Sequence, residues 1–175
     1  MKYLTHTQLA RLNLCKPELA RLKKALPKSS FTPREAANAY IAAGGYWTDI
    51  ARVYEELVNS EMLPDTQLVW KIARIAFREQ PEDSGLRIYA TTLGPDNWEN
   101  AADAADYAAH YSVAAAYATY AAYATYAAVY AADAARAAAN AAYAANANDN
   151  ADASCAGVRA EIIEMVLTEV EKTIA

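Results

Sequence analysis

Apolar residues recur at spacings of three and four through the first 96 residues, the pattern of amphipathic helices. Capping residues and prolines divide this part into six expected helices. The strongest local signal is Thr32-Pro33-Arg34-Glu35, in which Thr32 and Glu35 can form a capping box around Pro33. That helix is expected to end at Gly44-Gly45. The other expected starts are Thr5 or Thr7, Pro17, Thr48 or Asp49, Asp65, and Asp83 or Ser84.

The pattern changes over residues 101–147, where 27 of the 47 residues are alanine. Alanine is the best intrinsic helix former, and no glycine or proline occurs between Asp96 and Ala156. One unbroken helix over this stretch would be about 90 Å long, so we expect breaks near residues 110–113 and 146–150. Tyrosines recur at every third position within the block: Tyr117, Tyr120, Tyr123 and Tyr126. This spacing winds them around the helix, which favours core packing over a site for stacking ligands.

The expected fold class is all-α, a compact bundle of seven to nine helices with a central Ala/Tyr-rich helical hairpin. A last helix should run from Asp152 or Ser154 to Thr173. No segment alternates with period two over a useful length, so no sheet is expected. Residues 1–96 should form the amino-terminal helical part, and residues 97–175 the Ala/Tyr-rich and carboxyl-terminal helices, together one continuous domain.

The uncharged run over residues 111–132 is long enough to span a bilayer. Alanine gains little in lipid, however, and the tyrosine hydroxyls would lie near the bilayer centre. Nothing at the amino terminus has the form of a secretion signal. We therefore expect a cytoplasmic protein without a membrane span, in which Cys15 and Cys155 are buried free thiols.

Charge is distributed unevenly along the chain. Residues 1–34 hold eight Lys/Arg and one acid, a balance of +7. Residues 35–175 hold eight Lys/Arg and twenty acids, a balance of −12. The two segments can neutralise each other in the fold, or one of them can present a charged contact surface.

A search for chemistry finds no catalytic or metal motif. His6 and His110 are the only histidines, so no zinc or di-iron ligand set can be written. The Gly44-Gly45 pair lacks the Lys-Ser/Thr of a phosphate loop. We expect no catalytic residue, no metal and no cofactor, and therefore no enzyme.

Two sets of charged residues are candidate contact surfaces. The first set is acidic and would meet a basic partner protein: Asp103, Asp106, Glu161 and Glu164. Surface solvation is the simpler interpretation of these acids, and His110 could pair with Asp106 one turn away. The alternative set is Arg21, Lys24 and Lys28, within the basic segment 11–34. That stripe could contact nucleic-acid phosphates, although the chain as a whole is acidic, with a pI of about 5.1.

The chain resembles the Imm-5-like immunity proteins. The residues that carry the likeness are Leu4-Thr5 with Leu9, Leu12, Cys15 and Leu19, then Trp70, Pro81-Glu82-Asp83, Trp98-Glu99-Asn100 and the Ala-Ala-Asp-Ala-Ala-x-Tyr-Ala-Ala block. The family is alanine-rich and all-helical, and occurs near bacterial toxin genes and among phage accessory genes. The resemblance implies a role by protein binding, either neutralising a toxin or blocking a host defence component. It transfers no site residue. The expected function is a non-enzymatic inhibitor that occupies a partner protein, and the alternative is a nucleic-acid-associated protein.

Overall fold

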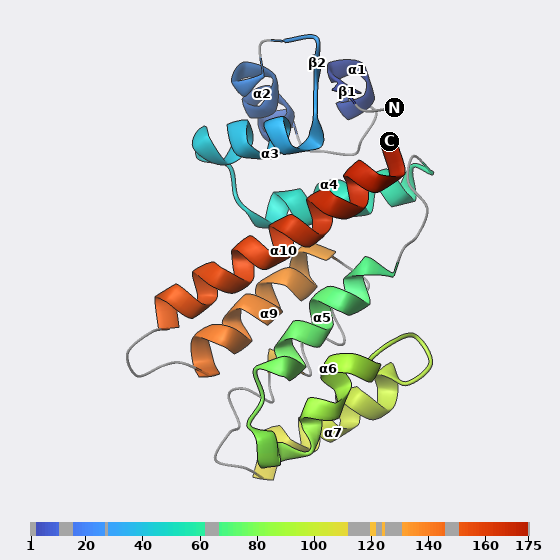
Figure 1. The fold of residues 1–175 in the computed structure, drawn as a ribbon, viewed down its shortest axis with the longest axis vertical. Coiled ribbons are helices and arrows are strands. Elements are labelled where there is room, and N and C mark those ends of the chain that lie inside the picture. The colour runs from blue at the N-terminus through green and yellow to red at the C-terminus, as the bar shows by residue number, and fades with distance from the viewer. Residues whose placement is uncertain are drawn as a thin grey trace. The chain divides into compact units, whose positions relative to one another are not determined.

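The computed structural model describes residues 3–10, 16–26, 28–61, 67–111, 120–121, 124, 131–145 and 151–174. These residues are mostly helical, so the all-α class is confirmed (Figure 1). Within the described ranges there are nine α-helices, at the upper end of the expected number. They are α1 (His6–Leu9), α2 (Lys16–Ala25), α3 (Pro33–Ala42), α4 (Thr48–Asn59), α5 (Leu68–Arg78), α6 (Tyr89–Thr92), α7 (Trp98–Tyr111), α9 (Ala131–Ala145) and α10 (Ala151–Ile174). Two 3₁₀ turns, η1 (Glu82–Ser84) and η2 (Leu86–Ile88), lie between α5 and α6.

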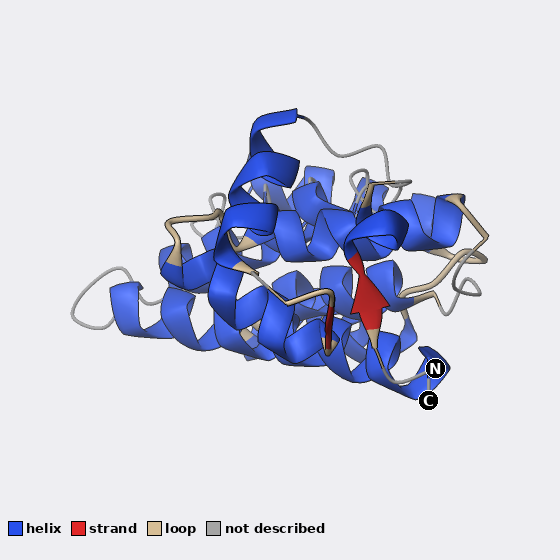
Figure 2. Ribbon diagram, turned by 90° about the horizontal axis from the view of Figure 1, so that it is seen from above, coloured by secondary structure: helices blue, strands red, loops and turns tan. Residues whose placement is uncertain are grey.

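The expectation of no sheet was wrong in one small element. Strand β1 (Leu4–Thr5) pairs antiparallel with β2 (Ser30–Phe31), and the two form the red elements of Figure 2. Leu4 lies opposite Phe31, and both side chains are buried. Strands of two residues are too short to produce a period-two pattern, which is why the sequence gives no sign of them.

The chain divides into two compact units. Unit 1 comprises residues 1–66 and 163–175, and unit 2 comprises residues 67–162. Helix α10 therefore contributes its first half to unit 2 and its second half to unit 1. The expected parts 1–96 and 97–175, and their union in one continuous domain, stay predictions.

In unit 1 the helix starts follow the local sequence signals. The Thr32 Oγ1 accepts from the Glu35 amide at 3.1 Å, and the Thr32 amide donates to the Glu35 carboxylate at 2.9 Å. This capping box and Pro33 fix the start of α3, as predicted. Thr5 caps α1 through the same device with Gln8. Helix α3 ends at Ala42, and Gly44 follows with a left-handed φ of 78°.

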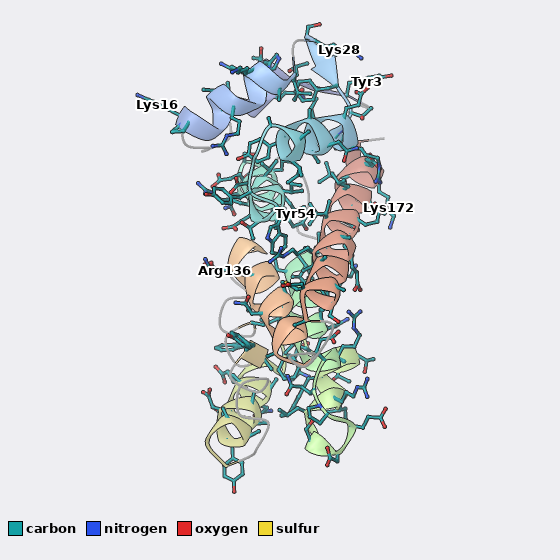
Figure 3. The ribbon with its side chains drawn as sticks, turned by 90° about the vertical axis from the view of Figure 1, so that its left-hand side faces the viewer. Tyr3, Lys16, Lys28, Tyr54, Arg136 and Lys172 are labelled. Carbon is teal, nitrogen blue, oxygen red and sulfur yellow. The ribbon has the colours of Figure 1, made fainter. Side chains whose placement is uncertain are left out.

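The core of unit 1 contains an apolar cavity of about 60 Å³ between α3, α4 and the second half of α10. Its lining includes Ala36, Ala37, Ile50, Leu57, Val166 and Val170. Tyr40 also lines it, and its hydroxyl donates to the Asp49 carboxylate at the cavity wall. Tyr54, labelled in Figure 3, is among the largest fully buried side chains.

In unit 2, α9 packs against α5, as Figure 1 shows. The packed faces are made of small and β-branched residues with no exposed area: Ile72, Ala73 and Ala76 on α5, and Ala134, Ala137, Ala138 and Ala141 on α9. Alanine has no side chain beyond Cβ, so the two helix backbones can approach closely. This part of the alanine block therefore serves packing, as its composition indicates.

The rest of the alanine block is only partly described. Ala121 and Ala124 are fully buried, in agreement with a packing role. The expected hairpin, most of its tyrosines and the break near residues 110–113 lie wholly or largely outside the described residues, as do Cys15, Asp65 and the break at 146–150. The last helix is confirmed by α10, and Cys155 on it is a buried free thiol, as expected.

Candidate functional site

Two of the four acidic candidates are held in ion pairs inside their own units. In unit 2, the Arg78 guanidinium donates to both Glu161 oxygens, at 2.8 and 2.9 Å. In unit 1, the Arg34 guanidinium donates to both Glu164 oxygens, at 2.7 and 3.0 Å, and to Glu171 at 3.2 Å. Both arrangements are bidentate, the strongest geometry for an arginine–carboxylate pair. Glu161 and Glu164 therefore hold α10 to α5 and α3, respectively.

The same contacts shift the ionisation of these groups. Hydrogen bonds from Arg34 lower the pKa of the half-exposed Glu164 carboxyl below its ordinary value. Hydrogen bonds to Glu164 and then Glu171 raise the pKa of the Arg34 guanidinium, and the bond to Glu161 raises that of Arg78. Arg34 belongs to the basic segment and its partners to the acidic one. In this contact the two segments neutralise each other, as the simpler interpretation of the charge asymmetry expects.

The other two acidic candidates lie on α7 in unit 2. Asp103 is exposed and Asp106 is half-buried. Glu99 is one turn before Asp103 and Tyr107 one turn after it, so all four lie on one side of the helix. The opposite side packs inward through Ala101, Ala102 and Ala105. We call Glu99, Asp103, Asp106 and Tyr107 the α7 acidic face.

Two of the three acids on the α7 acidic face, Glu99 and Asp103, are exposed. Among the described side chains, no cation pairs with Glu99 or Asp103. Tyr107 is 69% exposed, one of the largest exposures of a large hydrophobic residue in the described chain. Turn η2 packs against α7, and its Ile88 is 63% exposed. The acids on α7 thus occur in a part of unit 2 that also exposes an aromatic and an aliphatic side chain.

The three basic candidates differ from one another. Arg21 lies on α2 with its guanidinium 6.0 Å from the centre of the Tyr40 ring, and it donates to the Gly44 carbonyl at 3.3 Å. Lys24 is exposed on the same helix. Lys28 lies beyond the end of α2, as Pro27 predicts, and comes within 3.9 Å of the Glu35 carboxylate. Arg21 and Lys24 line one surface groove of unit 1, whereas Lys28 lines another.

The sequence interpretation did not single out several residues that lie beside the acidic candidates on α7 and the basic candidates on α2. Glu99 and Tyr107 share the α7 side of Asp103, and their spacing of four could have revealed them. On α2, Lys16 and Lys23 are also exposed, and Figure 3 shows Lys16 projecting from the start of the helix. Tyr46, next to Gly44-Gly45, is 71% exposed. Its exposure has no local sequence signal, because it depends on how the turn packs.

Within the described residues, no group of three or more His, Cys, Asp or Glu side chains could hold a metal ion. None of the helices in those residues is long and apolar enough to cross a membrane. The side chain of His110, the expected neighbour of Asp106, lies outside the described ones. No family model, curated protein or solved structure matches this chain, so the likeness to the Imm-5-like family stays a prediction.

Proposed function

We propose that this protein is a non-enzymatic binding protein that inhibits a basic partner protein by occupying it. The α7 acidic face is the proposed contact. The observation that supports this choice is the exposure of Tyr107 beside two acids, Glu99 and Asp103, that have no cationic partner among the described side chains. Tyrosine is enriched at the centres of protein interfaces, and unpaired charges steer association.

The chemistry of the face selects the class of partner. Glu99 and Asp103, both exposed on one side of a helix, attract a surface rich in lysine and arginine, and residues 35–175 as a whole carry a balance of −12. A nuclease or another nucleic-acid-binding protein carries such a surface. From the resemblance to immunity proteins we infer that the protein acts in the cytoplasm, either of a cell that must neutralise a toxin or of a host in which a phage must block a defence component.

The helix is suited to present this contact. Its inner side is fixed by Ala101, Ala102 and Ala105, which are almost completely buried. A side chain on a packed helix loses less conformational freedom on binding than one on an unsupported loop. Glu161 and Glu164 are less suitable contacts, because a partner would have to compete with Arg78 and Arg34 for their oxygens.

Affinity capture with matched variants tests this proposal. The immobilised wild-type protein, Asp103→Lys and Tyr107→Ala are each exposed to extracts of the producing cell and of its competitors or host. The proposal predicts a basic protein that the wild type and Tyr46→Ala retain and both α7 variants lose. The purified partner must then lose its activity when the wild-type protein is added. A partner retained equally by all variants, or one whose activity is unaffected, would overturn the proposal.

A further inference from the structure

Helix α2 in unit 1 carries four cations: Lys16, Arg21, Lys23 and Lys24. Among the described side chains, none of the three lysines has an acidic partner, and the contacts that the structure gives Arg21 are to a carbonyl and a ring. Four arginines elsewhere each donate to a carboxylate, whereas Arg74 donates to the Leu93 carbonyl; the four are Arg34, Arg78, Arg87 and Arg136. The side chain of Glu18, the one acid in the sequence of α2, lies outside the described ones. Among the described side chains, the positive charge of α2 is left available to an external anion.

The four cations also share the outer side of the helix. At about 100° per residue they fall within roughly half of its circumference. Leu26, just after the helix, is buried on the other side, and α2 packs against α3. Arg21 and Lys24 line a surface groove together with Ala43, which follows the end of α3. The groove thus lies between α2 and the residue that follows α3.

An exposed aromatic residue follows the turn that Arg21 contacts. Tyr46 is 71% exposed and comes two residues after Gly44, whose carbonyl accepts from Arg21 at 3.3 Å. Two residues span at most about 7–8 Å between Cα atoms, so the backbone of Tyr46 lies near the Arg21 guanidinium. We call Lys16, Arg21, Lys23, Lys24 and Tyr46 the α2 basic–aromatic surface.

Three features fix the backbone of the turn that carries Tyr46. Gly44 adopts a left-handed φ of 78°, which glycine accepts without strain. The backbone of Gly45 lies against the Tyr40 ring so closely that a Cβ there would come within 2.2 Å of it. The Tyr40 hydroxyl donates to Asp49 on α4. The backbone that carries Tyr46 is thus fixed, which lowers the conformational cost of a contact made by its ring.

We propose that the α2 basic–aromatic surface binds single-stranded nucleic acid, with backbone phosphates on the lysines and an unstacked base on the Tyr46 ring. Cations combined with an exposed aromatic ring are the general form of such sites. An acidic protein would also use the lysines, but every nucleobase offers a flat face to stack on the Tyr46 ring, and the bases of a duplex are already stacked on one another. The proposal is independent of the protein contact on α7, because the two surfaces belong to different units and have opposite charge.

The test is fluorescence anisotropy at low salt with an oligothymidylate of about 20 nucleotides, longer than the roughly 4–16 nucleotides that one small binding domain covers. The full-length protein is compared on this probe, on a DNA duplex and on poly-glutamate. Tyr46→Ala removes the proposed stacking platform. Its matched control is Tyr107→Ala, which removes a tyrosine of nearly equal exposure, 69% against 71%, from unit 2. The pair Lys23→Gln and Lys24→Gln is matched by Lys172→Gln, which removes an exposed cation from α10.

The wild type should bind the single strand more tightly than the duplex or poly-glutamate. Tyr46→Ala should weaken single-strand binding by about fivefold or more, as loss of one stacked base predicts, and leave the salt dependence unchanged. Each lysine removed from α2 should reduce the slope of log K against log salt by about 0.7. Tyr107→Ala and Lys172→Gln should bind like the wild type.

Three results would overturn the proposal. The first is absence of single-strand binding at low salt, with helicity intact by circular dichroism. The second is equal binding of oligothymidylate and poly-glutamate with no effect of Tyr46→Ala, which would mean that the surface recognises charge alone and favours an acidic protein. The third is an equal loss for Tyr107→Ala. None of these results bears on the capture experiment with the α7 variants, so the two proposals can fail separately.

Discussion

Replacing Gly45 by alanine should destabilise unit 1 more than the same replacement at Gly44, because the two glycines are required for different reasons. A Cβ on Gly45 would lie 2.2, 2.3 and 2.6 Å from three carbons of the Tyr40 ring, where ordinary contact begins at about 3.4 Å. A Cβ on Gly44 would meet nothing within 4 Å, but Gly44 has a left-handed φ of 78°. Position 45 therefore tests packing, and position 44 tests backbone conformation.

The expected magnitudes follow from these geometries. The ring must move by more than 1 Å to admit the new methyl group, but it is 4% exposed and its hydroxyl is bonded to Asp49. Overpacking of this kind costs about 1–3 kcal/mol, and full expulsion of a buried aromatic ring costs about 3–5 kcal/mol. We expect about 2–4 kcal/mol for Gly45→Ala. For Gly44→Ala we expect about 1 kcal/mol, the left-handed penalty less the reduced entropy of the unfolded chain.

Urea unfolding followed by circular dichroism measures both changes, and a double-mutant cycle identifies the cause. In a Tyr40→Ala background the ring is absent, so Gly45→Ala should lower the free energy of unfolding by at least about 1 kcal/mol less than it does in the wild type. In a Tyr40→Phe background the ring remains, so the cost should be unchanged. Equal effects at positions 44 and 45, or an undiminished cost with Tyr40→Ala, would refute the packing explanation and with it the fixed turn that carries Tyr46.

Three further predictions concern stability. Ala37→Val should fill part of the 60 Å³ cavity and stabilise unit 1 by up to about 1.4 kcal/mol, at about 24 cal/mol per Å³; a lower urea midpoint would contradict this. Replacing Ala121 or Ala124, both fully buried, by leucine should destabilise the fold by about 1–3 kcal/mol through overpacking. If both replacements leave the stability unchanged, the packing role of these two alanines is wrong. Arg34 lowers the folded-state pKa of Glu164, so the Arg34–Glu164 pair stabilises the fold above the ordinary glutamate pKa of about 4.3. This stabilisation is lost as the pH falls below that value and the carboxylate becomes protonated. Glu164→Gln should therefore reduce the decrease in urea midpoint between about pH 5 and pH 2. A pH profile identical to that of the wild type would contradict the stabilising role of the Arg34–Glu164 pair.

The features that the sequence predicted are those encoded locally. Thr32 and Glu35 are three residues apart and need only each other to cap α3, so the capping box could be predicted without tertiary information. The side of α7 that carries Asp103 could also be located, because helical spacing brings together residues three and four apart.

The features that the sequence did not reveal depend on contacts between distant segments. Arg34 and Glu164 are 130 residues apart, and nothing near either residue predicts that they pair. The sequence therefore predicted Glu164 as a contact for a partner, whereas both of its carboxylate oxygens accept hydrogen bonds from Arg34 inside unit 1. The pairing of β1 with β2 also joins distant segments, with only two residues on each side. The role of Gly45 is local in sequence, but it depends on how the Tyr40 ring packs.

The association rate with the captured partner tests the central claim most directly. Stopped-flow measurements at low salt would compare the wild type, Asp103→Lys and Lys24→Glu, two single charge reversals at exposed positions on helices of different units. Electrostatic steering by the α7 acidic face predicts that Asp103→Lys slows association several-fold, that added salt narrows the difference, and that Lys24→Glu has little effect. The opposite ranking, with Lys24→Glu slow and Asp103→Lys unchanged, would contradict the account and identify the α2 basic–aromatic surface as the contact.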